Sequence, residues 1–255
     1  MKKFLTILLV VAMLIPFAAL SETYNLATAG SDGELSITMG TNAEFPPFEF
    51  VEGEDVVGVD ADIAHEIAND LGLTLLISNM AFDSIIPALT SGQIDMGIAA
   101  MTVKEERLLS VDFSEPYYNA RQALIVKVGG SVVDAETLKD KTIGVQNGTT
   151  GDYAAEEYTA DVQRFGKALD AVLELQNGKL DAVIVDEPVA KNIVAALGNP
   201  DLILLDAVAF EDEFYAIAVA KGHPELLEAI NATIKRIQED GTLDAILLKY
   251  FPTEE

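Results

Sequence analysis

From Ser36 onward, short runs of β-branched residues alternate with segments of helical periodicity. Ser36–Met39 has the pattern of a buried strand, and the segment Asp60–Leu71 places its apolar residues on one helical face, with Gly72 as the expected C-terminal stop. This alternation is typical of βαβ units. The chain is therefore predicted to be an α/β protein with mostly parallel sheets.

One unit of this pattern recurs later in the chain. Residues 85–98, an apolar helix, a Ser-Gly turn and a strand, align without gaps with residues 171–184. The identical pairs are Leu89/Leu175, Gly92/Gly178, Asp95/Asp181 and Ile98/Ile184. The repeat predicts two similar lobes, although a chance likeness stays open because glycine ends helices in many folds.

Ligands of parallel α/β sheets bind beyond the carboxyl ends of the strands. In the two repeats these ends are residues 99–102 and residues 185–188. If the two lobes face each other, a cleft between them would bring both strand ends together, and these are the first places where a site is expected.

The N-terminus has the features of an export signal. Met1-Lys2-Lys3 is cationic, Phe4–Leu20 is apolar apart from Thr6, and small residues follow around Ser21. We predict a signal peptide over residues 1–21, cleaved after Ser21, and a protein that is secreted to the periplasm. An uncleaved anchor is the alternative, since the run is close to the shortest that spans a bilayer. The chain has no cysteine for lipid attachment.

Composition excludes several functions. The chain has 42 acidic and 16 basic residues and a formal net charge of −26, so it repels nucleic acid. With no cysteine and two separated histidines, His65 and His223, a thiolate or histidine metal centre and a cysteine nucleophile are not expected. We expect neither a metal nor a cofactor.

Two charged residues follow the strand ends. Arg107 lies within a loop and one helical turn of the first end, where a guanidinium can bind a carboxylate through two hydrogen bonds. Taken alone it has the features of a surface arginine paired with Glu105 or Glu106, since most charged side chains are solvated. Asp186 ends the second strand, where it would be either the N-cap of a helix over residues 188–197 or an acceptor for a cationic group.

The segment Gly144–Gly151 leaves a strand and enters a helix expected to begin near Asp152. Glycines and hydroxyls at a helix N-terminus favour an anion, and because the segment lacks the Gly-Lys-Ser/Thr ending of a P-loop, a small carboxylate suits it better than a triphosphate. An ordinary Asn-Gly turn has the same composition.

Aromatic residues surround two prolines in the segment Ala43–Phe50. A Pro-Pro pair makes a rigid extended loop that can hold an aromatic ring as a pocket wall. Phe48 and Phe50 are expected in the core, whereas Phe45 could be a wall, as could Phe82 at the start of its helix.

Together these segments resemble the bacterial extracellular solute-binding proteins of family 3, which bind polar amino acids for ABC importers. The resemblance runs from about Leu35 to Phe251. It rests on the segments Gly40–Phe48, Phe82–Leu89, Met101–Arg107, Asp112–Tyr118, Gly144–Thr150, Asp240–Thr242 and Lys249–Phe251.

The resemblance implies a type II periplasmic-binding-protein fold with two lobes and a two-strand hinge. The first lobe would comprise residues 34–116 and 215–255, the second lobe residues 122–210, and the hinges residues 117–121 and 211–214.

The resemblance also implies a role for individual residues. Arg107 would bind the ligand α-carboxylate with backbone N–H groups of Thr102 and Thr150, and Asp186 would bind the α-ammonium with the Thr102 hydroxyl and the Ala100 carbonyl. Phe45 and Phe82 would enclose the ligand side chain. The full set of expected binding residues is Asn42, Phe45, Phe82, Ala99, Ala100, Thr102, Arg107, Gln146, Thr149, Thr150 and Asp186.

The expected function is a monomeric receptor that binds a free L-amino acid and delivers it to the membrane permease of an ABC importer. A polar neutral or a basic ligand is expected, and an acidic one is disfavoured because no second cation is visible. Glu44 could reach a cationic ligand or face solvent. The alternative is an enzyme on the same fold, dehydratase-like or lytic, for which only Glu44 and Glu187 are conceivable acid–base groups.

Overall fold

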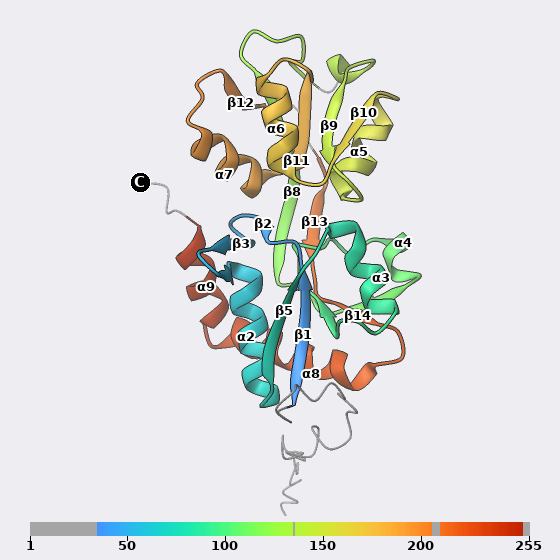
Figure 1. The fold of residues 1–255 in the computed structure, drawn as a ribbon, viewed down its shortest axis with the longest axis vertical. Coiled ribbons are helices and arrows are strands. Elements are labelled where there is room, and N and C mark those ends of the chain that lie inside the picture. The colour runs from blue at the N-terminus through green and yellow to red at the C-terminus, as the bar shows by residue number, and fades with distance from the viewer. Residues whose placement is uncertain (1–34, 135, 206–209, 252–255) are drawn as a thin grey trace, which may run out of the picture.

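The computed structural model describes residues 35–134, 136–205 and 210–251, so the predicted signal peptide over residues 1–21 lies outside the described residues. Within these ranges, no helix combines the length and the apolar character needed to cross a membrane. The described chain folds into two lobes, each with its own β-sheet (Figure 1).

The elements alternate between strands and helices, as the sequence pattern predicts. The strands are β1 Ser36–Thr41, β2 Glu44–Phe45, β3 Glu49–Glu52, β4 Asp55–Val57, β5 Thr74–Asn79, β6 Met96–Gly97, β7 Val111–Phe113, β8 Tyr118–Lys127, β9 Ile143–Gln146, β10 Val162–Phe165, β11 Ala182–Asp186, β12 Leu202–Leu205, β13 Asp212–Tyr215 and β14 Ala218–Ala220. The helices are α2 Val59–Leu71, α3 Ile85–Thr90, α4 Glu105–Leu108, α5 Thr150–Tyr158, α6 Ala168–Gln176, α7 Glu187–Leu197, α8 Pro224–Glu239 and α9 Thr242–Tyr250, with 3₁₀ turns at Phe82–Ser84 and Glu136–Leu138.

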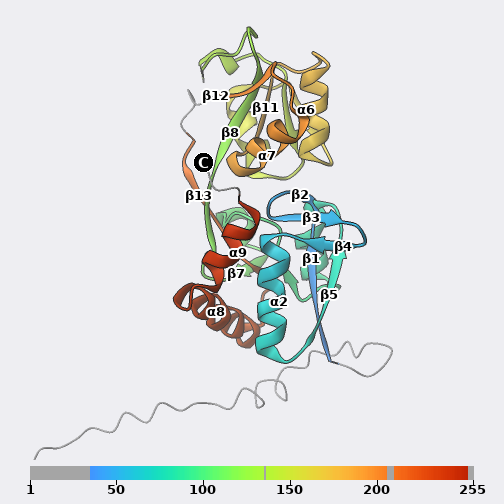
Figure 2. The ribbon, with the colours of Figure 1, turned by 90° about the vertical axis from the view of Figure 1, so that its left-hand side faces the viewer.

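The first lobe is built on a five-stranded sheet with the order β5-β1-β6-β14-β7. Helix α2 confirms the expected amphipathic segment: Ile63, Ala64 and Ile67 are fully buried, and Gly72 closes the helix in the left-handed conformation. Helices α8 and α9 pack beside α2 on the same side of the sheet (Figure 2). C-terminal segments therefore complete the lobe that the N-terminal segments begin.

The second lobe is built on the strand order β10-β9-β11-β8-β12, with β13 paired to β8 as a sixth strand. Helices α5 and α6 pack against β9 and β11, and α7 packs against β8, β11 and β12. The two sequence repeats occupy matching places, since α3 leads to β6 in the first lobe and α6 leads to β11 in the second.

Both sheets are mostly parallel, as expected, but each contains one strand that runs against the others: β14 in the first lobe and β8 in the second. In the first lobe β1 is parallel to β5 and β6, but β14 is antiparallel to β6 and β7. In the second, β9 is parallel to β10 and β11, but β8 is antiparallel to β11 and β12. The reversed strand β8 enters the second sheet from the first lobe, and the reversed strand β14 lies where the chain has returned to the first lobe.

Two neighbouring strands join the lobes. Strand β8 leaves the first lobe and runs into the second sheet, and β13 pairs with its first residues, with Tyr215 opposite Tyr118 and Asp212 opposite Arg121. Both strands cross between the lobes in Figure 1. They form the hinge about which one lobe can rotate relative to the other.

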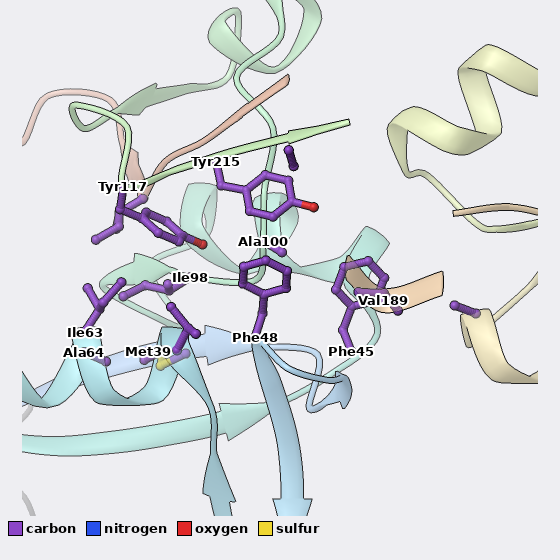
Figure 3. Packing of buried hydrophobic residues seen from close by; sticks show 14 of the residues in the cluster. Met39, Phe45, Phe48, Ile63, Ala64, Ile98, Ala100, Tyr117, Val189 and Tyr215 are labelled. Carbon is purple, nitrogen blue, oxygen red and sulfur yellow. The ribbon is translucent and has the colours of Figure 1, made fainter. Parts of the chain in front are cut away.

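A small antiparallel sheet of β2, β3 and β4 replaces the simple extended loop expected around the two prolines. Phe48 of this segment is fully buried, and its ring packs edge-on against Tyr215 at 5.1 Å between ring centroids (Figure 3). Aromatic packing thus fixes this segment against the hinge strand β13, directly beside the cleft.

Substitution of Gly58 tests the close packing of this segment. Gly58 precedes α2 with φ +128°, and a Cβ atom there would lie 2.1 Å from the Phe48 carbonyl oxygen. Because that atom is backbone, we expect Gly58→Ala to lower the free energy of unfolding by at least about 2 kcal/mol. Gly53→Ala is the matched control: Gly53 has φ +67° with open space around it, so the cost should be about 1 kcal/mol. Equal urea midpoints for the two variants would contradict this explanation.

Candidate functional site

A cavity lies between the lobes, at the carboxyl ends of β6 and β11. It encloses about 300 Å³ of empty space including its opening. Its lining comprises Asn42, Phe45, Glu49, Phe82, Ala99, Ala100, Thr102, Arg107, Gln146, Thr149, Thr150 and Asp186. The structure therefore brings together all the residues expected from the sequence, and it adds Glu49.

Arg107 is buried, which rules out the alternative of a surface arginine paired with Glu105 or Glu106. Its Nη1 donates to the Thr102 carbonyl at 2.7 Å, and its Nη2 donates to the Gly148 carbonyl of the other lobe at 3.1 Å. The guanidinium also lies over the Phe82 ring, 5.3 Å from its centroid. Burial lowers the pKa of Arg107, but an arginine stays charged because its usual pKa is far above neutral.

Asp186 occupies the N-cap position before α7, but its side chain makes no capping hydrogen bond. The carboxylate instead accepts a hydrogen bond from the Tyr215 hydroxyl, so Asp186 has the expected N-cap position while its side chain is directed to another partner. Asp186 is 5% exposed, and desolvation, followed by the negative charge of Glu213, raises its pKa to about 7. Near neutral pH it is thus poised between its neutral and charged forms, and a nearby cation would favour the charged one.

The N-terminus of α5 faces the cavity from the second lobe. The helix begins at Thr150, earlier than the expected start near Asp152, because the Thr149 hydroxyl accepts a hydrogen bond from the Asp152 backbone N–H and acts as the N-cap. The Thr149 hydroxyl also donates to the Gln146 carbonyl at 2.8 Å. This places the first turn of a helix, where backbone N–H groups favour an anion, opposite Arg107.

Glu49 is a lining residue that the sequence reasoning missed. It is 1% exposed on β3, and its Oε2 atom has no hydrogen-bond partner among the described residues. A hydrogen bond joins it to Asp60, whose carboxylate accepts bonds from the Ala100 N–H at 2.7 Å and the Tyr117 hydroxyl at 2.9 Å. Burial and the charge of Asp60 raise the pKa of Glu49 well above its usual value, and burial raises that of Asp60 to about 6.

Glu213, on the hinge strand β13, is a second residue that the sequence reasoning missed. Its Oε2 accepts hydrogen bonds from the hydroxyls of Thr102 and Thr150, both at 2.7 Å, and a longer one from Gln122 Nε2 at 3.4 Å. The carboxylate thus connects lining residues of the two lobes from behind the cavity.

Further contacts join the lobes near the cavity. Gln146 Nε2 donates to Asn42 Oδ1 at 2.8 Å, which uses two of the expected binding residues to contact each other. Glu44 forms an ion pair with Lys167 of the second lobe at 2.5 Å. The sequence left open whether Glu44 reaches a cationic ligand or faces solvent. The structure instead pairs it with Lys167, outside the cavity lining.

In the described part of the chain, no group of three or more histidine or acidic side chains is placed to hold a metal ion. The chemistry of the cavity is that of a buried cation and buried carboxylates next to aromatic rings. Such a cavity can bind a small molecule that carries both charges.

Comparisons with known proteins identify the family of the chain. Residues 37–253 match the bacterial extracellular solute-binding proteins, family 3. The chain is 34% identical to the arginine-binding extracellular protein ArtP of Bacillus subtilis (strain 168), over 100% of both chains. An ancestral arginine-binding protein is 42% identical in structures bound to arginine and to glutamine. The arginine-bound structure has a TM-score of 0.80 and covers 85% of this chain and 98% of that one. The glutamine-bound structure has a TM-score of 0.79, with 85% and 97% covered.

The burial of Glu49 predicts a pH-dependent cost in stability. Below its usual pKa of 4.5 the side chain is protonated in both the folded and the unfolded chain, but at higher pH the unfolded chain releases the proton more easily than the folded one. We expect Glu49→Gln to leave the free energy of unfolding nearly unchanged at pH 4 and to raise it by about 1 to 3 kcal/mol at pH 8.

Urea unfolding at pH 4, 6 and 8 measures this difference. Glu52→Gln is the control, since Glu52 is an exposed glutamate on the same strand and should show no pH-dependent effect. A difference between Glu49→Gln and the unsubstituted protein that stays constant with pH would contradict the assignment.

Proposed function

The chain belongs to family 3 of the bacterial extracellular solute-binding proteins, and from this premise we propose that its cavity binds a basic amino acid, with L-arginine preferred. The protein is a substrate-binding receptor that delivers an amino acid to an ABC importer, and it is not an enzyme. We place it in the periplasm, after removal of residues 1–21.

The charges of the cavity account for an α-amino acid. Arg107 and the N-terminus of α5 bind the α-carboxylate, and Asp186 with the Ala100 carbonyl binds the α-ammonium. Arg107 follows a strand of the first lobe, whereas Asp186 ends a strand of the second. A ligand that touches both stabilises the arrangement in which the lobes meet, because it binds this arrangement more tightly than an open one.

Glu49 is the observation that favours a basic side chain. Glu49 Oε2 is buried and has no hydrogen-bond partner within the described ranges, and Arg107 and Asp186 would pair with the α-carboxylate and α-ammonium of the ligand and not with Glu49. An unpaired buried acceptor is costly, and a guanidinium or ammonium would satisfy it. Ligand cations also stack well on aromatic rings, which Phe45 and Phe82 supply in the cavity lining.

A neutral polar ligand is the second candidate, and the amides support it. Asn42 and Gln146 both line the cavity, and each can donate to or accept from a ligand amide. The related ancestral protein bound to glutamine in one structure and to arginine in another supports the same pair of candidates. The Asn42–Gln146 hydrogen bond occupies these groups in part, which is why we rank the basic ligand first.

A thermal-shift screen of the common L-amino acids tests the function directly. A ligand at 100 times its dissociation constant should stabilise the chain by about 2.7 kcal/mol, and we expect L-arginine to give the largest shift.

Arg107→Met and Asp186→Asn should each weaken binding by about 2 to 5 kcal/mol, since each leaves an opposite ligand charge unpaired. Arg121→Met, which changes an arginine outside the cavity lining, is the control for calorimetry. No shift with any amino acid would refute the function.

Glu49→Gln separates the two ligand candidates. We expect calorimetry to show a loss of about 10- to 100-fold in arginine affinity, because a neutral amide replaces a charged acceptor, and a change of no more than a few-fold in glutamine affinity. Glu44→Gln is the matched control, because Glu44 pairs with Lys167 and should not determine selectivity. Equal losses for arginine and glutamine would show that Glu49 does not recognise the ligand side chain.

A further inference from the structure

We propose that Glu213 is a positioning residue of the binding cavity. It accepts the hydroxyl hydrogens of Thr102 and Thr150, so neither hydroxyl can donate to the ligand. The Thr102 oxygen is left as an acceptor for the ligand ammonium. This inference rests on the proposed amino-acid binding. It assigns a role to a residue that does not line the cavity.

The hydroxyl hydrogens of Thr102 and Thr150 are both used in hydrogen bonds to Glu213. A threonine hydroxyl has one hydrogen and two lone pairs. Thr102 and Thr150 both give that hydrogen to Glu213 Oε2, at 2.7 Å. The Thr150 oxygen then accepts from Gln122 Nε2 at 3.0 Å. For Thr102 the remaining lone pairs make its oxygen an acceptor, which suits an ammonium and does not suit a carboxylate.

The position of Thr102 is fixed from its other side as well. Its carbonyl accepts from Arg107 Nη1 at 2.7 Å, and its backbone forms a bridge with Tyr215 of the hinge strand. The Val103 N–H donates to the Phe214 carbonyl at 3.0 Å. Thr102 is thus held between Arg107, which binds the ligand carboxylate, and Glu213, so its hydroxyl has one orientation available.

Strand geometry explains why Glu213 can do this. Side chains alternate along β13, so Glu213 and Tyr215 share one face while Asp212 and Phe214 point the other way and are exposed. Tyr215 donates to Asp186, and Glu213 accepts from Thr102 and Thr150. Both inward residues of this hinge strand therefore support ligand-binding groups without lining the cavity themselves.

The charge of Glu213 adds a second effect. Asp186 is faced by Arg107, Glu49, Tyr215 and Glu213, and after desolvation the charge of Glu213 is the next cause that raises the pKa of Asp186 to about 7. The same charge helps to keep Arg107 protonated. Glu213 thus increases the negative potential at the ammonium end, and it makes Asp186 easier to protonate when the cavity is empty.

The test compares Glu213→Gln with the unsubstituted protein, using L-arginine and L-glutamine as probes in calorimetry from pH 5 to 8. We expect the affinity of both probes to fall about 10- to 100-fold at pH 8, because an amide can donate to the threonine oxygens and reverse their polarity. The affinity of the unsubstituted protein should also fall as the pH drops below about 7 and Asp186 takes up a proton. In Glu213→Gln this fall should begin at a lower pH, because the neighbouring charge is gone.

Two further variants separate positioning from general stability. Glu213→Asp keeps the charge but is too short to reach both threonines, so it should lose affinity and keep the pH profile of the unsubstituted protein. Asp212→Asn removes an exposed carboxylate on the other face of the same strand and should change neither property. Urea midpoints for each variant show whether the chain is folded.

A measurement without ligand separates this inference from the proposed function. The Asp186 carboxyl can be titrated by ¹³C NMR in the empty protein, and its pKa should be lower in Glu213→Gln. Unchanged affinity and an unchanged Asp186 titration in folded Glu213→Gln would overturn the proposal. If no amino acid binds the unsubstituted protein, the proposed function fails, whereas the NMR titration still decides whether Glu213 acts on Asp186.

Discussion

The structure depends on one buried guanidinium placed where the two lobes meet. Among the described residues that line the cavity, Arg107 is the only cation, and it has Glu213 and Asp186 as charged neighbours. Its hydrogen bonds to backbone carbonyls of both lobes hold it without neutralising its charge. Within the described part of the chain no carboxylate is hydrogen-bonded to Arg107, so the guanidinium can attract a small anion. The acids around it favour an anion that belongs to a molecule with a positive group as well.

Burial of the carboxyl groups of Glu49, Asp60 and Asp186 costs folding free energy, which indicates that these residues serve binding and not stability. Desolvation raises the pKa values of Glu49, Asp60 and Asp186 together, so each carboxyl resists ionisation in the empty cavity. A ligand with positive groups offsets that cost when it binds. Perturbed carboxyls next to a cleft are the usual mark of a functional site, and here they lie on three separate elements, β3, α2 and β11.

The sequence predicted the residues at strand and helix ends better than those within strands. Asp186 is the last residue of β11, and Arg107 and Thr150 lie in helices that follow β6 and β9. The rule that ligands bind beyond the carboxyl ends of strands pointed to these segments, and the family resemblance supplied the roles of the residues. Glu49 and Glu213 lie within β3 and β13, and their partners come from segments far away along the chain. Only weak signs of these two residues are present in the sequence: Glu49 stands between two phenylalanines, and Glu213 is two residues before Tyr215, on the same face of the strand. The alternation of helices and strands predicted the common direction of most strands, but it did not reveal the two reversed strands, β8 and β14, which follow the passages of the chain between the lobes.

The position of Glu213 on a crossing strand has a consequence for the order in which the lobes separate. In a rotation about β8 and β13, each atom moves in proportion to its distance from the axis. Contacts next to the axis, such as those of Glu213 with the two threonines, change little over the first degrees of rotation. The Glu44–Lys167 pair belongs to segments that do not form the axis, and it must lengthen earlier. A rotation about these strands would therefore stretch the Glu44–Lys167 pair before the hydrogen bonds of Glu213 with the two threonines.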